Sequence, residues 1–229
     1  MSTPFKERII IAVGGSLLVP DAIDTHFIKD LRDIASNLIN QGYQVILVPG
    51  GGKIARNYQE ALKELQHDDP ESLDWVGVKA IHLNADFLYR VFTGFDVHSI
   101  IHEPEELEGV DSSLVIKAAF KPGNSSDMGA VRMAEISGAK RIINFSNTSH
   151  VYSADPRIHA DAKKFETLSW SEYRDLIPTE WVPGMSAPFD PIASQLAEES
   201  GITVAVLGAS VENLQNYLDG NEFQGTILS

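Results

Sequence analysis

The sequence predicts an α/β fold, a three-layer α/β/α sandwich built around a mainly parallel central sheet. Short apolar runs of strand type alternate with amphipathic runs of helical period through the first 150 residues. Strands that alternate with helices in this way usually pair in parallel, and helices then cover both faces of the sheet. Gly-rich turns follow the first two strand-like runs directly, at the end of a strand where such sheets bind ligands.

The predicted strands of this first part are apolar runs of buried type, at residues 8–13, 44–49, 97–101, 114–118 and 141–145. The predicted helices have apolar residues spaced three and four apart, at residues 23–38, 53–65, 73–92 and 127–136. Gly42 and Gly138 end the first and the last of these helices. Pro70, in the polar segment 67–71, predicts a loop.

The rest of the chain continues the same alternation. A loop at 153–162 leads to a helix near 171–177, and a Pro/Gly-rich stretch follows at 178–188. The last predicted elements are a helix at 190–200, a strand at 203–207 and a helix at 211–218. The 229 residues are enough for a sizeable core. We expect a single domain over residues 1–229, in which a lobe of about residues 1–117 meets a lobe of about residues 118–229.

The composition excludes several classes of function. A net charge of −14 disfavours nucleic acid and anionic membrane surfaces as partners. The chain contains no cysteine, which excludes disulfides, zinc–thiolate sites and thiol nucleophiles. No apolar run approaches the ~20 residues that a membrane span needs, and the stretch from Met1 to Arg8 lacks the pattern of a secretion signal. We therefore expect a cytoplasmic protein.

Two Gly-rich turns give the strongest chemical signal. Residues 14–16 (Gly-Gly-Ser) and 50–52 (Gly-Gly-Gly) each follow a strand, and glycines there let backbone N–H groups approach an anion. Lys53 and Arg56 follow the second turn, beside the positive end of the helix dipole. Two cations at that end favour a bound anion, whereas tight packing alone would also explain the first turn. Neither turn is a Walker P-loop or a Gly-x-Gly-x-x-Gly dinucleotide fingerprint.

Three further polar elements belong to the same predicted crevice. The turn at residues 121–127 holds a lysine, an amide, two hydroxyls and a carboxylate, and one of its serines can cap the next helix. Asp155 and Asp190 each precede a proline, so each is either a turn or cap residue or a candidate magnesium ligand. Because ligands bind beyond the carboxyl ends of parallel strands, we expect all three turns to line one crevice.

Six segments, taken in order, resemble the amino acid kinase superfamily and, within it, uridylate (UMP) kinases of the archaeal type. These segments are residues 13–20, 48–58, 74–77, 122–127, 151–156 and 189–191. The resemblance implies an amino acid kinase or carbamate kinase-like fold, and an enzyme of pyrimidine biosynthesis that phosphorylates UMP to UDP. It also implies ATP and Mg²⁺ as cofactors, and a homohexamer assembled as a trimer of dimers.

The resemblance also implies roles for individual residues. Acceptor binding is implied for Gly51, Arg56, Asp74, Gly123, Ser125, Ser126 and Asp127. ATP binding is implied for Gly14, Gly15, Ser16, Gly52, Asn147, Tyr152 and Asp155. The expected catalytic residues are Lys53 and Asp190, which would balance the charge at the transferring phosphate. No residue is assigned as a metal ligand, and the seven histidines are expected to be surface or packing residues.

Three positions depart from the family pattern. Ala12 stands where many members have a lysine, so Lys53 is expected to supply that charge instead. The pair at 118–119 is Ala-Ala rather than Gly-Gly, and residues 148–150 are Thr-Ser-His rather than Val-Asp-Gly. Two alternatives therefore stay open: a nucleotide- or oxyanion-binding homologue with little or no kinase turnover, or a kinase for another small acceptor.

Overall fold

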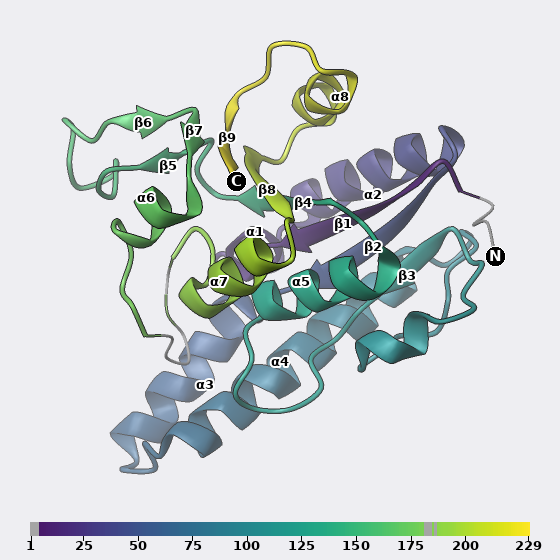
Figure 1. Cartoon of the computed structure of the whole chain (residues 1–229). Coiled ribbons are helices and arrows are strands. Elements are labelled where there is room, and N and C mark those ends of the chain that lie inside the picture. The colour runs from purple at the N-terminus through teal and green to yellow at the C-terminus, as the bar shows by residue number, and fades with distance from the viewer. Residues whose placement is uncertain (1–4, 181–184, 186) are drawn as a thin grey trace.

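A seven-stranded sheet forms the centre of the computed structural model, which describes residues 5–180, 185 and 187–229 (Figure 1). The strand order is β3-β2-β1-β4-β8-β9-β7, and every pair is parallel except β8 with β9. The strands are β1 Glu7–Val13, β2 Tyr43–Pro49, β3 Leu114–Ile116, β4 Arg141–Ser146, β7 Thr167–Leu168, β8 Thr203–Gly208 and β9 Gly225–Leu228. The predicted α/β sandwich with a mainly parallel sheet is confirmed.

The order of the sheet reverses at β1, which has β2 on one side and β4 on the other. Val13, the last residue of β1, pairs with Pro49 of β2 and with Phe145 of β4. The carboxyl ends of these three parallel strands therefore meet at one edge of the sheet. Ligands of open α/β sheets bind at such a switch point, where the chain leaves neighbouring strands in opposite directions.

One face of the sheet is covered by three helices: α2 Thr25–Asn40, part of α4 Pro70–Val91, and α8 Val211–Asp219 (Figure 1). Apolar residues spaced three and four apart on α2, from Phe27 to Leu38, are buried in the core on this face. This spacing places them on one stripe of the helix, so the polar residues between them face outward.

The opposite face is covered by elements that follow residue 103: η1 Pro104–Leu107, α5 Ser126–Ser137, α6 Trp170–Arg174 and α7 Pro191–Glu199. Figure 1 shows α5 and α7 side by side in front of the sheet. Small buried residues, among them Ala134 on α5 and Ala197 on α7, take up little space where these helices pack into the core. Gly138, in the left-handed conformation, ends α5 as predicted.

The hairpin of α3 Gly52–Glu64 and α4 extends away from the sheet (Figure 1). The loop predicted at residues 67–71 is present but shorter: residues 67–69 lie between the helices, and α4 begins at Pro70 itself. The Asp69 carboxylate accepts a hydrogen bond from the backbone N–H of Ser72 at 2.9 Å and caps the helix. Proline suits this first position because it has no N–H to leave unpaired. Within the described ranges, no helix is both long and apolar enough to cross a bilayer.

Two other local predictions also differ from the structure. Residues 97–101 form no strand, but only isolated bridges from Val97 to Leu114 and from Ile101 to Lys117 beside β3. A one-turn helix, α1 Gly15–Leu18, begins directly after β1, where no helix was predicted. The predicted Pro/Gly-rich stretch at 178–188 lies partly outside the described residues.

A small antiparallel hairpin, β5 Val151–Tyr152 with β6 Lys164–Phe165, lies beside the main sheet and was not predicted. Thr226 on β9 links this hairpin to the sheet. Its hydroxyl accepts a hydrogen bond from the backbone N–H of Val151 at 2.8 Å and donates one to the carbonyl of Phe165. Thr226 is fully buried, so no water can replace these bonds.

Replacing Thr226 with valine keeps the volume of the side chain but leaves a buried N–H and a buried carbonyl unpaired. We expect the free energy of unfolding to fall by about 2 kcal/mol, measured by urea denaturation. The matched control is Thr203→Val on the neighbouring strand β8, whose side chain is half-buried and whose hydroxyl makes a long bond of 3.4 Å to the Lys140 carbonyl. Equal stability losses in the two variants would contradict a linking role for Thr226.

Candidate functional site

A pocket of about 650 Å³ lies where β1, β2 and β4 end. This volume is within the range of small-molecule and cofactor sites. The residues that line it come from both halves of the chain: 14–16, 50–52, 55, 56, 59, 74, 77, 81, 124–127, 144–148, 150–157, 176–178, 185, 187, 188 and 190. The pocket therefore brings together the three turns and the two aspartates that the sequence places in one crevice.

The two glycine turns touch each other inside this pocket. A Cβ added to Gly15 would overlap the backbone of Gly52, and a Cβ added to Gly52 would overlap the carbonyl of Gly15. Gly52 also has a φ of 66°, in the left-handed region that favours glycine. No other residue type fits at either position without moving the ends of β1 and β2 apart.

Helices α3 and α4 position the polar groups beside the second turn. The Asn84 side chain, buried on α4, donates a hydrogen bond of 2.8 Å to the Gly50 carbonyl. Arg56 on α3 lines the pocket, and none of the described residues forms a hydrogen bond or an ion pair with its guanidinium. Its donors are therefore available to a ligand.

Asp74 on α4 connects this side of the pocket to the turn at 121–127. Its carboxylate accepts a hydrogen bond from the backbone N–H of Gly123, and its side chain is buried. Burial raises the pKa of the Asp74 carboxyl, while the bond from Gly123 acts in the opposite direction. The bond fixes the turn relative to α4.

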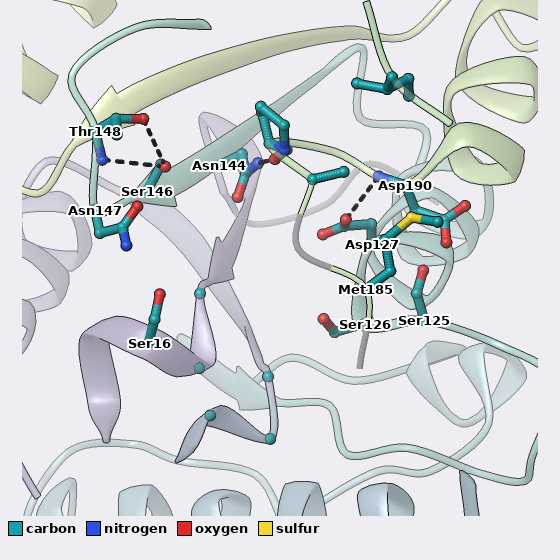
Figure 2. A pocket seen from close by; sticks show the side chains of 18 of the residues that line it. Ser16, Ser125, Ser126, Asp127, Asn144, Ser146, Asn147, Thr148, Met185 and Asp190 are labelled. Atoms are coloured by element: carbon teal, nitrogen blue, oxygen red, sulfur yellow. Dashed lines mark hydrogen bonds between the residues drawn. The ribbon is translucent and has the colours of Figure 1, made fainter. Parts of the chain in front are cut away.

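Asp127 and Asp190 lie next to each other on one wall of the pocket, near Ser125 and Ser126 (Figure 2). The backbone N–H of Asp190 donates to the Asp127 carboxylate at 2.9 Å. Burial and then the charge of Asp190 raise the pKa of Asp127 to about 7, and burial raises the pKa of Asp190 as well. At neutral pH the Asp127 carboxyl is therefore poised between its protonated and ionised forms.

The position of Asp190 is fixed on both sides. Its carboxylate accepts a hydrogen bond of 2.7 Å from the Ala193 N–H and caps α7. The fully buried Tyr173 hydroxyl binds both backbone groups of Phe189, accepting from its N–H at 2.6 Å and donating to its carbonyl. This arrangement holds the chain rigidly just before Asp190.

The facing wall is formed by residues that follow β4. Figure 2 shows residues 146–148 on the side of the pocket away from Asp127 and Asp190. His150 is buried in this wall, with its Nδ1 atom 2.9 Å from the Ser149 hydroxyl. Tyr152 also lines the wall, and its ring lies edge-on to that of His150, with the centroids 6.2 Å apart.

Asp155 and Arg157 line the pocket as an ion pair, with 2.7 Å between the closest nitrogen and oxygen atoms. The hydrogen bond from Arg157 lowers the pKa of the Asp155 carboxyl to about 2. Asp155 is therefore ionised at neutral pH and already has a cationic partner.

A sequence model of the Amino acid kinase family matches residues 7–208, which is most of the chain. This chain belongs to the amino acid kinase family. The segment matched includes both glycine turns, the turn at 121–127 and Asp190, so the family pattern and the pocket involve the same residues.

Relatives of this amino acid kinase match it over nearly its full length. It is 33% identical over 225 residues to a uridylate kinase of Methanocorpusculum labreanum, covering 96% of this chain and 95% of the relative. It is 31% identical over 229 residues to a uridylate kinase of Natronomonas pharaonis, covering 96% and 98%. Among solved structures, the uridylate kinase of Archaeoglobus fulgidus has a TM-score of 0.77 at 27% identity, covering 96% and 99%. The UMP kinase of Ureaplasma parvum, with a TM-score of 0.78 at 22% identity, covers 100% of both chains and has the same fold.

All but two of the site residues predicted from the sequence line the pocket of this amino acid kinase. Gly123 is one exception, because it reaches the pocket only through its bond to Asp74. Lys53 is the other: its backbone N–H donates to the Val19 carbonyl at 3.0 Å, and the residue does not line the pocket. The structure thus places no lysine of the second turn at the wall, and the catalytic role of Lys53 stays a prediction.

Several lining residues were not predicted from the sequence. Gln59 and Asn144 are buried polar residues whose side-chain amides donate to the carbonyls of Leu73 and Pro188. Asn144 interrupts an apolar strand, and that signal was available in the sequence. Arg157 lies in a loop, where no periodicity marks its position.

Asp127 gives a pH-dependent stability prediction. Its pKa of about 7 in the folded protein lies above the unfolded value of about 3.8, so the folded state is stabilised by the proton at acidic pH and loses that contribution as the pH rises through 7. Asn at this position can still accept the Asp190 N–H without a charge. We therefore compare the free energies of unfolding of Asp127→Asn and wild type at two pH values. From pH 5 to pH 8.5, we expect their difference to change by roughly 2–4 kcal/mol in favour of Asp127→Asn.

The measurement is thermal or urea unfolding of both proteins at the two pH values. Asp111→Asn, which removes an exposed acid outside the pocket, is the control and should show little change with pH. A stability difference between Asp127→Asn and wild type that does not vary with pH would contradict the assigned environment of Asp127.

Proposed function

We propose that this amino acid kinase transfers the γ-phosphoryl group of ATP to UMP, giving ADP and UDP. The main support is a single pocket that combines two glycine turns with the Arg56 guanidinium and the Asp74 carboxylate. The relatives that match it over nearly their full length are uridylate kinases. In the reaction, an oxygen of the UMP phosphate forms a bond to the γ-phosphorus, and the bond between that phosphorus and the bridging oxygen of ADP breaks.

On the acceptor side, Arg56 binds the phosphate of UMP. A guanidinium can donate two parallel hydrogen bonds to a phosphate, and that of Arg56 has no competing partner among the described residues. The first turn of α5, with Ser125 and Ser126, adds backbone N–H groups and the positive end of a helix dipole. The Asp74 carboxylate can accept further hydrogen bonds beside the one from the Gly123 N–H, and it accepts them from the ribose hydroxyls.

On the ATP side, the glycine turns bind the phosphates through backbone N–H groups. Bare glycine backbone allows this approach, as the contact between Gly15 and Gly52 illustrates. Asn147 and Tyr152 lie in the wall beyond β4 and bind the adenosine. His150, at one of the positions that depart from the family pattern, is buried in the same wall.

Magnesium fits the carboxylates of the pocket. Mg²⁺ in phosphoryl-transfer sites usually takes one or two protein carboxylates and completes its shell with phosphate oxygens and water. Asp190 and Asp127 are two adjacent carboxylates that line the pocket, and among the described residues no three acids or histidines form a larger metal-binding group. Bound there, Mg²⁺ would neutralise negative charge on the transferring phosphate.

We also propose that the chain assembles as a homohexamer through the α3–α4 hairpin. Four large apolar side chains on this hairpin are at least 40% exposed: Tyr58, Leu65, Trp75 and Leu83. Burying such a patch between copies would remove apolar surface from water. Light scattering after gel filtration should give six times the 25.1 kDa of one chain, and the mass of a monomer would contradict this proposal.

The function is tested first by ADP release from MgATP with UMP, CMP, dUMP, carbamate or isopentenyl phosphate, with products identified by mass. We expect UDP and ADP with UMP, at about 1–100 turnovers per second. If UMP and ATP bind but no acceptor gives product, the protein is a nucleotide-binding homologue without turnover. Product from another acceptor alone would identify a different kinase.

Arg56→Ala should raise the KM for UMP by about 10- to 100-fold, because it removes a charge-assisted pair of hydrogen bonds. The KM for ATP should change little. Arg90→Ala removes an equal charge from an exposed position on α4 outside the pocket and serves as the control. Steady-state kinetics with each substrate varied in turn gives both constants, and an unchanged KM for UMP would exclude Arg56 as the phosphate ligand.

A further inference from the structure

A smaller pocket of about 120 Å³ shares a wall with the larger one. Ile81 and the turn residues 124–126 line both pockets. Behind this shared wall, the smaller pocket is lined by residues 117–121, which follow β3, and by the first turns of α5. None of the functions proposed above uses this pocket.

Lys117, directly after β3, lines the smaller pocket and is only 7% exposed. None of the described residues forms a hydrogen bond or an ion pair with its ammonium group. The acid that acts on it electrostatically is Glu106, whose carboxylate already accepts hydrogen bonds from the backbone N–H groups of His102 at 3.1 Å and Glu103 at 2.7 Å. A buried ammonium without a partner is costly, and this one also has a pKa lowered by burial to about 8.

Gly129 on α5 provides the space for this ammonium. A Cβ at Gly129 would lie 2.9 Å from Lys117 Nζ, closer than side-chain atoms normally approach. Both residues line the pocket, so the charged end of Lys117 lies at the pocket wall. Glycine is a poor residue inside a helix, and the room that it leaves for Lys117 is the feature that explains it here.

The other groups around the pocket also suit an anion. Lys121 and Arg132 also line it; both are exposed, and Arg132 is paired with Glu135 at 2.9 Å. Lys117 is therefore the buried cation of this pocket, in a chain whose net charge is −14. Apolar residues such as Val48 and Met128 form much of the remaining wall. The small volume limits the occupant to one compact charged group.

We propose that this pocket binds a small oxyanion of phosphate type, with Lys117 as its counter-ion. The anion is either free phosphate or the phosphate group of a larger effector whose remainder extends outside. Because residues 124–126 line both pockets, an anion here contacts the turn that is proposed to bind UMP. Binding at the two pockets is therefore linked, and an anion that alters UMP affinity has its own affinity altered by UMP to the same degree.

The test is isothermal titration of the full chain with inorganic phosphate and, separately, with glycerol 3-phosphate at constant ionic strength. Lys117→Met removes the charge, and Gly129→Ala keeps the charge but displaces the ammonium from its position. Each should weaken one phosphate site by about tenfold or more. Arg56→Ala and the exposed-surface control Lys140→Met should retain that site. Thermal unfolding of each variant shows whether it is folded.

The two ligands distinguish the two sources. Tighter binding of glycerol 3-phosphate with the same dependence on Lys117 indicates an effector ester, whereas binding of inorganic phosphate alone indicates the free ion. The proposal is overturned if the wild type binds neither ligand, or if binding depends on Arg56 and not on Lys117. Binding needs no catalysis, so this outcome is independent of whether the protein phosphorylates UMP.

Discussion

The backbone contact between Gly15 and Gly52 is the constraint on which the pocket depends. It brings the turns after β1 and β2 closer than any side chain would permit. Backbone hydrogen bonds extend the contact across three strands: the Gly14 N–H donates to Phe145 of β4, and the Gly50 N–H donates to Val13 of β1. The surface offered to a phosphate is therefore mainly backbone, and its geometry is set by the sheet. A chain with a net charge of −14 needs such a local site, because its overall field does not attract anions.

The polar side chains around this surface are held by one or two hydrogen bonds each, made between distant segments. Asn84 joins α4 to the second glycine turn, Asp74 joins α4 to the turn at 121–127, and Tyr173 fixes the backbone before Asp190. The same burial that fixes these groups raises the pKa of Asp74, Asp127 and Asp190. The site thus combines precise placement with acids that are costly to ionise, a combination common in functional sites.

The sequence was a good guide where one rule decided the structure. The buried strand runs and the glycine turns were predicted at nearly their observed positions, because strand periodicity and the glycine requirement are local. It was a poor guide where a distant partner decided. Residues 97–101 had the composition of a strand but pair only at isolated bridges, with Leu114 of β3 and with Lys117. The short hairpin of β5 and β6 depends on hydrogen bonds to Thr226, which is 75 residues from Val151 and 61 residues from Phe165 along the chain. Lys53 met the local criterion for a phosphate ligand, yet it lies outside the pocket wall.

Lys117 shows the same limit for function. In the sequence it lies inside the predicted strand at 114–118, and no role was predicted for it. In the fold it is buried, because α5 covers the end of β3 and presents Gly129, the one residue type without a side chain, to the lysine. Arg56 and Lys117 are both cations without partners among the described residues. They line different pockets, and residues of the 124–126 turn line both of these pockets. If UMP binds at Arg56 and an anion binds at Lys117, as proposed, the turn contacts both occupants, and its conformation is the physical link between the two sites.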